Sequence, residues 1–301
     1  MKQWRMAARD AAELFFWPML AALLPWAAGF RLIRCLARRA WFYEADARAA
    51  LQIARTRLAV NDERDWITRY CFMRMMDHAD LYLSLTRSRA WLEKHLIRHG
   101  AWPQQKPFIG MTFHWGGGML ALRSMQYATG PFAGVAIAQD KSAYRGRPLL
   151  YAYVRLRNFE TARAIGGGLS FTGSAARKFV GALRGGVSIC GLFDVPPAPN
   201  VKFRAVKFLG ARALFPTGAV RLALAHRAPL VIFRCMVDPV SGKREIWIES
   251  PALDVSEAAL MERAVKSLEE AVRTQPSAWH MWGVLDALEK AAEEHGGAVQ
   301  P

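Results

Sequence analysis

The sequence predicts an α/β protein in which a mixed central sheet is flanked by helices, preceded by a hydrophobic N-terminal helix and a helical segment. Three observations predict it. From residue 107 onward, short apolar runs of strand type alternate with amphipathic stretches of helical period. Turns that contain glycine or proline separate these runs. At 301 residues and 52% hydrophobic content, the chain can bury one large core or two modest ones.

The first 40 residues predict a membrane anchor with basic flanks. Residues 14–30 carry no charge and are near the lower limit of length for a helix that spans a bilayer. Pro18 and Pro25 interrupt the run, which favours a kinked or interfacial helix. Because basic residues lie on both sides, both clusters can rest on one anionic leaflet, and we expect a monotopic anchor. These residues are Lys2, Arg5 and Arg9 before the run, and Arg31, Arg34, Arg38 and Arg39 after it.

Two other interpretations of this apolar run stay open. A cleavable signal peptide would have its cleavage point near Ala27 and Ala28. Asp10 and Glu13 lie directly before the run and argue against that interpretation. The third interpretation is a helix buried in the core of the protein.

The segment after the anchor is expected to be helical. Over residues 31–98, charged and apolar residues alternate at helical spacing. Asn61 is expected to cap the helix that begins there. Residues 100–107 contain two prolines and a glycine, and they form a connector to the next part of the chain.

From residue 107, the predicted elements alternate in the order expected for one mixed sheet between helices. The first strand, over 107–113, leads through a glycine loop to a helix near 118–128. The same periodicities predict strands at 132–138, 187–193, 230–237 and 244–249, and helices at 144–159, 174–184, around 221–224 and at 257–273.

The charge balance predicts an anionic partner. The chain has 41 Lys and Arg against 25 Asp and Glu, a net charge of +16, which attracts polyanions. It has no basic helix with base-reading spacing, no zinc spacing and no RNA-binding aromatic motif, so nucleic acid is not expected. Eleven tryptophans accompany the arginines, and both residue types settle at headgroup depth. The expected partner is therefore anionic membrane lipid.

No metal or cofactor is predicted. Cys35, Cys71, Cys190 and Cys235 are widely spaced and form no CxxC, so they are interpreted as apolar fillers in a reducing compartment. His95 and His99 are four residues apart, but no third ligand accompanies them, and a solvated helix face is the expected setting.

The candidate site begins at His114, which ends an apolar strand and precedes Gly116, Gly117 and Gly118. Glycine removes the side-chain wall, so backbone N–H groups can approach a ligand closely. If a helix starts in this loop, the N–H groups also lie at its positive end. A histidine beside such N–H groups suits acyl or phosphoryl chemistry. The alternative is a buried structural histidine before a glycine loop.

Residues 107–119 resemble the catalytic block of the lysophospholipid acyltransferase superfamily, in particular its lipid A biosynthesis (lauroyl/myristoyl) acyltransferase branch. His114 and Gly116 match that block. The resemblance covers residues 105–285 in order and spacing. It continues in 185–194, a strand that ends in Asp194, in 206–223 with Pro216-Thr217-Gly218 and the strand at 228–233, and in 275–282 with Trp279-His280-Met281-Trp282.

The resemblance implies a membrane-associated O-acyltransferase at the cytoplasmic face of the bacterial inner membrane. It would move a fatty acyl chain from an acyl-carrier-protein or CoA thioester to a hydroxyl of a lipid or glycolipid, with His114 as general base. Residues 41–301 would form a single acyltransferase-like α/β domain, of which 41–100 is the helical part, and residues 1–40 the anchor.

Substrate would be bound by the glycine loop and by a second turn at Thr217 and Gly218, where backbone N–H groups can hold a phosphate or a thioester oxygen. Arg221, one turn further on, would meet a phosphate. Simple helix capping by Thr217 and a solvated helix face for Arg221 are the structural alternatives. Arg163 is a weak match to a further basic residue that the family tends to carry.

One position departs from the family pattern, because Met119 occupies the place of the acid that follows the histidine after four residues. Methionine cannot orient an imidazole or stabilise its charged form. One possibility is that another acid replaces it, with Asp194 at the end of a neighbouring strand the first candidate and Asp140 the second. Otherwise His114 acts alone, or the protein no longer catalyses and binds lipid or a partner at the membrane. We predict an enzyme that uses His114 and Asp194.

Overall fold

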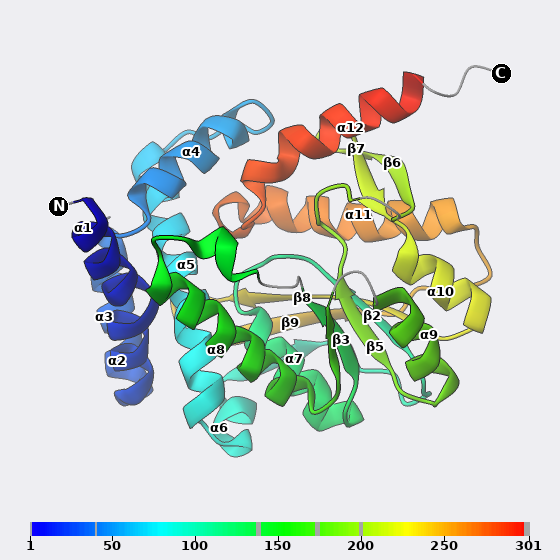
Figure 1. Ribbon diagram of the computed structural model, residues 1–301, viewed down its shortest axis with the longest axis horizontal. Coiled ribbons are helices and arrows are strands. Elements are labelled where there is room, and N and C mark those ends of the chain that lie inside the picture. Colours follow the sequence, from blue (N-terminus) through cyan, green and yellow to red (C-terminus); the bar gives the residue numbers. More distant parts are fainter. Residues whose placement is uncertain (1, 40, 137–139, 172–174, 199–200, 298–301) are drawn as a thin grey trace.

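The structure is a computed structural model that describes residues 2–39, 41–136, 140–171, 175–198 and 201–297 (Figure 1). Its centre is a seven-stranded sheet with the order β1-β9-β8-β2-β5-β3-β4. The strands are β1 (Leu96–His99), β2 (Ile109–Thr112), β3 (Ala133–Ala136), β4 (Leu169–Phe171), β5 (Ile189–Leu192), β8 (Leu230–Val237) and β9 (Arg244–Glu249).

The sheet is mixed, as the sequence predicts, and most of its neighbouring strands run parallel. Strands β8, β2, β5, β3 and β4 all run in one direction. The chain reverses between β8 and β9, which pair antiparallel, and β1 lies parallel to β9 at the edge. The strands expected at 107–113, 187–193, 230–237 and 244–249 are all present, whereas β1 lies where helix was expected.

Helices cover both faces of the sheet, and the alternation of side chains along the strands explains how. Phe108 and Gly110 of the β2 region face one side, where Phe108 packs with Leu120 and Met125 of α7 (Gly118–Thr129). Ile109 and Met111 face the other side, in the core that also contains α10 (Gly218–His226) and α11 (Glu257–Thr274). Figure 1 shows α7 and α8 (Pro148–Ile165) on one side of the sheet and α11 on the other.

A two-stranded antiparallel hairpin, β6 (Phe203–Phe208) and β7 (Ala211–Pro216), packs against α11 and α12 (Leu285–Gly297). The sequence analysis expected neither strand. Both turn residues, Leu209 at φ 49° and Gly210 at φ 91°, have positive φ, as a two-residue turn of type I′ requires. Leucine at the first of them hides the turn from sequence patterns, since Asn, Asp or Gly is usual there.

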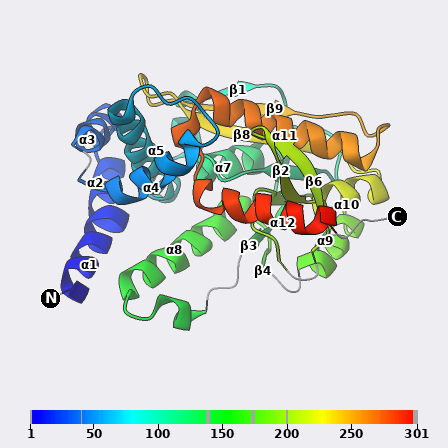
Figure 2. The same cartoon turned by 90° about the horizontal axis from the view of Figure 1, so that it is seen from above.

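The N-terminal residues correct the expectation of one anchor helix over 14–30. They form α1 (Lys2–Asp10), a π-helical turn (Ala11–Phe16), α2 (Trp17–Leu23) and α3 (Trp26–Arg38), with a break before Pro25. Among the described residues, no helix combines the length and the apolar character needed to cross a bilayer. Figure 2 shows these helices gathered at one end of the molecule.

Side chains from distant parts of the chain fasten these helices to the rest of the protein. Arg87 donates to the carbonyl oxygens of Ala22 and Leu24, each at 2.6 Å, and so satisfies the end of α2. The Tyr43 and Tyr82 hydroxyls donate to carbonyl oxygens in the π-helical turn. Buried residues from Leu14 to Leu288 belong to one hydrophobic cluster. The N-terminal segment is therefore partly core, while Phe16, Met19 and Leu23 stay exposed along one side of it.

The remaining helices are close to expectation, with two corrections. The helix expected at 144–159 is α8, which begins at Pro148 and continues to Ile165. The cap of α5 (Glu63–Thr86) is Asp62 and not Asn61, because the Asp62 carboxylate accepts the Asp65 N–H at 2.9 Å. The others are α4 (Glu44–Arg55), α6 (Arg89–Lys94), α9 (Ala175–Arg184) and the short 3-10 helices Lys141–Tyr144, Pro276–Ala278 and Trp282–Val284.

Candidate active site

His114 and Asp194 meet because they follow two neighbouring parallel strands. Strands β2 and β5 pair in a register that puts Thr112 opposite Leu192, so the residues two positions further on are also opposite one another. The His114 Nδ1 and the Asp194 Oδ1 are 2.9 Å apart. The carboxyl ends of parallel strands are where α/β sheets hold their ligands.

Asp194 is fully buried, and three hydrogen bonds converge on its carboxylate. The His114 backbone N–H donates to Oδ2 at 2.9 Å, and the Trp279 indole N–H donates to the same oxygen at 3.0 Å. The third bond is that of the imidazole Nδ1. Because the carboxylate can only accept, it holds the proton on Nδ1 and leaves the Nε2 lone pair available.

The imidazole is placed to meet a substrate. The His114 side chain is 33% exposed, and its Nε2 has no hydrogen-bond partner among the residues that the structure describes. Its backbone is held as well, since the carbonyl oxygen accepts the His280 N–H at 3.1 Å. A fixed ring with one free basic nitrogen is the arrangement that a general base needs.

The protonation of His114 follows from its surroundings. Burial alone lowers the pKa of the imidazole, but the charge of Asp194 and its hydrogen bond outweigh burial and raise the pKa above the usual 6.5. A raised pKa in the folded state means that this pair stabilises the protein fully below pH 6.5. That stabilisation is lost as the pH rises through the pKa of the folded protein.

We expect an NMR titration to report a pKa above 6.5 for His114 in the wild-type protein. In Asp194→Asn the pKa should fall below that value, because burial remains while the attraction of the carboxylate is gone. The same spectra contain a control in His95, whose pKa burial lowers and which has no contact with Asp194. An unchanged His114 pKa in the variant would show that Asp194 does not set it.

A second group of polar and charged side chains lies near this pair. Arg157 of α8 pairs with Asp77 of α5 at 2.9 Å, and their charges act in opposite directions on the pKa of His114. The Nδ1 of His280 is 3.1 Å from a guanidinium nitrogen of Arg74. Burial, followed by the charge of Arg74, lowers the pKa of His280 to about 3, so His280 is neutral. Sequence patterns did not single out these four residues as site residues, although His280 lies in the block at 275–282.

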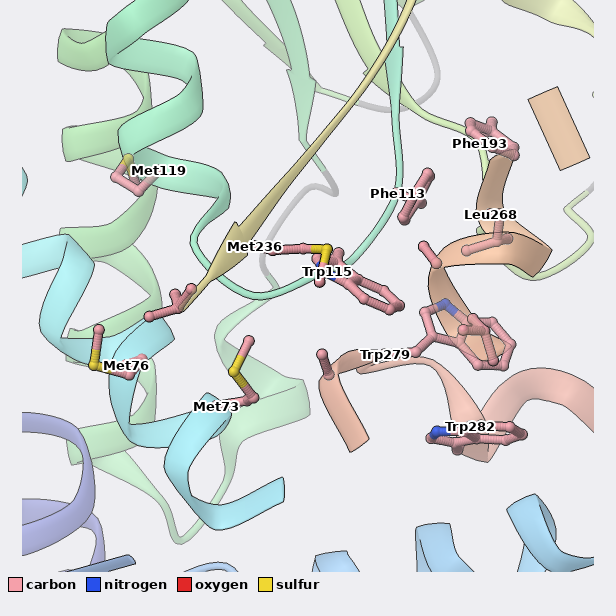
Figure 3. Close-up of a cluster of buried hydrophobic side chains, with 14 of the residues drawn as sticks. Met73, Met76, Phe113, Trp115, Met119, Phe193, Met236, Leu268, Trp279 and Trp282 are labelled. Atoms are coloured by element: carbon pink, nitrogen blue, oxygen red, sulfur yellow. The ribbon is translucent and has the colours of Figure 1, made fainter. Parts of the chain in front are cut away.

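Met119 is a core residue. It is 3% exposed, in the first turn of α7, and belongs to the same buried cluster as Met73 and Met76. Figure 3 shows Met119 and Trp279 at opposite sides of this cluster. Because Trp279 donates to the Asp194 carboxylate, Met119 lies away from that carboxylate. The acid beside His114 therefore comes from the end of β5 and not from the start of α7.

Two weaker candidates from the sequence have other roles. Asp140 is exposed and caps the 3-10 helix at Lys141–Tyr144 through the Ser142 N–H. Arg163 pairs with the buried Glu160 at 2.6 Å and donates to the Ser84 carbonyl oxygen. Among the described residues, neither one contacts His114.

The three glycines after His114 differ in what they permit. Gly116 has φ +34°, and a Cβ there would lie 2.8 Å from the Met73 methyl group. A Cβ on Gly117 would lie 2.7 Å from an Asp80 carboxylate oxygen. Gly118 starts α7 with open space around it, and its N–H donates to the Gly116 carbonyl oxygen at 3.0 Å. Close packing accounts for the first two glycines.

We expect Gly117→Ala to destabilise the protein by about 1–3 kcal/mol, because a methyl group there overpacks a buried carboxylate. Gly118→Ala is the matched control. It should leave stability unchanged or raise it by up to about 1 kcal/mol, since alanine restricts the unfolded chain and suits a helix. Urea unfolding followed by tryptophan fluorescence measures both variants. Equal effects of the two substitutions would contradict the packing argument.

The second predicted turn lies at the start of α10. Thr217 is buried, but its hydroxyl does not cap the helix; both its N–H and its hydroxyl donate to the Lys202 carbonyl oxygen, at 2.9 and 3.3 Å. Gly218 has open space where a Cβ would be. Arg221 is exposed, with its Nε 4.0 Å from a carboxylate oxygen of Glu257. No contact among the described residues joins these three to His114.

The similarity of this chain to known proteins lies in its structure. No protein-family profile matches the chain, and no curated protein matches it. The structure is similar to that of the 1-acyl-sn-glycerophosphate (LPA) acyltransferase PlsC from Thermotoga maritima, with 14% sequence identity and a TM-score of 0.36. The match covers 80% of this chain and 97% of that one.

The site contains no metal-binding constellation within the described ranges, where no three His, Cys, Asp or Glu side chains converge as ligands. The two cysteines in the sheet, Cys190 of β5 and Cys235 of β8, are also unsuited to nucleophilic chemistry, because burial raises the pKa of both thiols. Burial raises the pKa of Cys190 to about 12, so this thiol stays protonated.

Proposed function

We propose that this protein transfers an acyl chain from a thioester to a hydroxyl group, with His114 as general base and Asp194 as the residue that orients it. The observation that carries the proposal is the 2.9 Å contact between the two side chains at the carboxyl ends of β2 and β5, with the Nε2 of His114 available. The blocks of sequence that resemble lipid A acyltransferases contain both residues and support the same chemistry.

The reaction follows from the tautomer that Asp194 holds. Nε2 of His114 accepts the proton of the acceptor hydroxyl while the hydroxyl oxygen attacks the thioester carbonyl carbon. The carbon–sulfur bond then breaks, and the proton on Nε2 passes to the departing thiolate. Asp194 stabilises the imidazolium that exists between these two proton transfers and keeps its own charge throughout.

Two further features suit this chemistry. Helix α7 begins at Gly118, so the positive end of its dipole lies in the loop that follows His114, where negative charge develops on the carbonyl oxygen. Arg157, which is 32% exposed, is close enough to lower the pKa of His114 and is a candidate for the phosphate of a donor or acceptor.

The proposal includes a lipid acceptor at a membrane surface, which would be the cytoplasmic face of the bacterial inner membrane. Phe16, Met19 and Leu23 are 53%, 42% and 59% exposed, on the outer side of the N-terminal helices. In the sequence, basic residues precede and follow these three, among them Arg9 and Arg31. Exposed apolar residues flanked by basic ones are typical of a helix that lies in a membrane interface. Acyl carrier protein or CoA is the proposed thioester carrier, and the net charge of +16 suits either acidic partner.

The test is turnover of acyl-carrier-protein and CoA thioesters by purified protein with a membrane lipid extract. We expect wild-type protein to form acylated lipid and His114→Ala to lose that activity. His99→Ala, an exposed histidine paired with Glu245, is the matched control and should act like wild type. If wild-type protein forms no product from donors of several chain lengths, the alternative of a lipid-binding protein without catalysis replaces the proposal.

A further inference from the structure

We propose that a basic groove between α3 and the β8–β9 turn binds the phosphate headgroup of an anionic membrane phospholipid. The groove has a volume of about 490 Å³ and lies apart from His114, which is not among its lining residues. Its lining combines aromatic and aliphatic side chains with cations. The residues are Trp26, Ala27, Phe30, Arg31, Arg34, Lys94, His95, Val240, Ser241 and Lys243.

The cations of this groove form no close ion pair with a carboxylate among the described residues. The nearest approach is that of Lys243, whose charge acts with hydrogen bonds from Ser241 and Val240 to lower the pKa of Asp238 against the effect of burial. Arg31 and Arg34 come from α3, Lys94 from the end of α6, and Lys243 from the β8–β9 turn. None of the four forms an ion pair with a described residue, and no Asp or Glu lines the groove. By contrast, many other arginines of this chain are paired, as Arg147 is with Asp10. Four unpaired cations around one hollow match a phosphate group.

The walls of the groove are fixed before a ligand arrives. Gly242 has φ +71°, and a Cβ there would lie 2.8 Å from the Phe30 ring, so the glycine lets the turn approach α3 closely. The Trp26 ring lies 4.6 Å from the guanidinium carbon of Arg244, which is fully buried and paired with Asp80. Because preformed walls need not be ordered on binding, they favour affinity for a small charged group.

The apolar surroundings favour a lipid over free phosphate. Val240 lines the groove and is 77% exposed. Leu23 is exposed three residues before Trp26, at the end of the apolar strip with Phe16 and Met19. A phospholipid places its acyl chains beside its phosphate, so it can use the strip and the groove together, which an inorganic ion cannot. Arginine, lysine and tryptophan are also the residue types that gather at headgroup depth.

This inference rests on the membrane association in the proposed function, and it is tested by vesicle co-sedimentation at fixed ionic strength. The vesicles are phosphatidylcholine alone or phosphatidylcholine with phosphatidylglycerol. Arg31→Gln/Lys243→Gln removes two exposed groove cations. Lys178→Gln/Arg184→Gln removes two exposed charges from α9, at the opposite end of the molecule from α3 in Figures 1 and 2.

We expect the groove variant to bind phosphatidylglycerol vesicles at least tenfold more weakly, roughly a severalfold loss per cation, and the α9 variant to change by about twofold or less. Equal losses of vesicle binding in both variants would mean that the overall positive charge attracts the vesicles, and would overturn the groove as the binding site. So would an unchanged groove variant. Circular dichroism and thermal unfolding confirm that both variants are folded.

Three arms separate the inference from its rivals. Protection from thermal unfolding by inorganic phosphate, as strong as that by short-chain phosphatidylglycerol, would overturn the lipid assignment. If the groove variant Arg31→Gln/Lys243→Gln has a raised KM for the acyl-carrier-protein thioester but binds vesicles like wild type, the groove is a protein-docking surface and the lipid assignment is overturned. His114→Ala should bind vesicles like wild type, so absent acyl transfer with groove-dependent binding would overturn only the proposed function.

Discussion

Replacing Asp194 with asparagine is expected to lower the kcat of acyl transfer by up to about 10⁴-fold, the loss seen when the base of a serine protease loses its orienting acid. Asparagine keeps the shape of the side chain but presents an amide N–H as well as an oxygen. It can therefore hold His114 in the tautomer with the proton on Nε2, which cannot accept a proton from the acceptor. It also cannot stabilise the imidazolium, because the negative charge 2.9 Å from Nδ1 is gone.

The measurement is steady-state thioester turnover with a saturating acceptor, so that kcat is read directly. Trp279→Phe is the matched comparison, because it removes one hydrogen bond to the carboxylate and keeps an aromatic ring in the core. We expect that variant to lose about tenfold or less. If Asp194→Asn keeps more than a tenth of wild-type kcat, the aspartate is structural and His114 acts unaided.

The second large effect is expected at the buried ion pair of Asp80 and Arg244, both fully buried and in direct contact. Asp80→Asn leaves the guanidinium of Arg244 charged, unpaired and out of water. We expect it to destabilise the protein by about 3–5 kcal/mol, measured by urea unfolding at neutral pH. The substitution also affects the packing of the candidate site, because an Asp80 carboxylate oxygen lies next to Gly117 in the loop after His114.

A double substitution distinguishes the cost of an unpaired charge from the worth of the pair. Burial raises the pKa of Asp80 even beside Arg244, so loss of hydration outweighs the attraction between the two groups. Asp80→Leu/Arg244→Met should therefore be much closer to wild type in stability than Asp80→Asn. If the double variant is as unstable as Asp80→Asn, the ion pair itself contributes that stability, and the loss in Asp80→Asn is not due to the unpaired charge of Arg244.

Sequence patterns located the histidine–aspartate pair because each residue ends an apolar strand. Two parallel neighbours bring such ends together, so His114 and Asp194 needed only the correct strand order, in which β5 lies beside β2. Arg157 and Asp77 had no such signal. Each is one charged residue on a helix with many, and only the packing of α8 against α5 brings them together.

Other expectations failed for equally local reasons. The apolar run at 14–30 predicts one helix, but a break at Leu24 and Pro25 lets its two parts fold against each other and against α5. The sequence analysis missed the β6–β7 hairpin because Leu209 occupies a turn position at which Asn or Gly is usual and serves as the signal of a turn. Close packing at Gly116 and Gly117 depends on Met73 and Asp80, which are distant in sequence.

The indole bond from Trp279 to Asp194 also determines when a growing chain can assemble this carboxylate. Asp194 leaves the ribosome 85 residues ahead of Trp279. At usual rates of synthesis that interval lasts about 4 to 17 seconds. During it, β2 and β5 have both been synthesised, whereas the indole N–H that donates to the carboxylate has not. The nascent chain therefore contains His114 and Asp194 for several seconds before Trp279 is synthesised and can donate to the carboxylate.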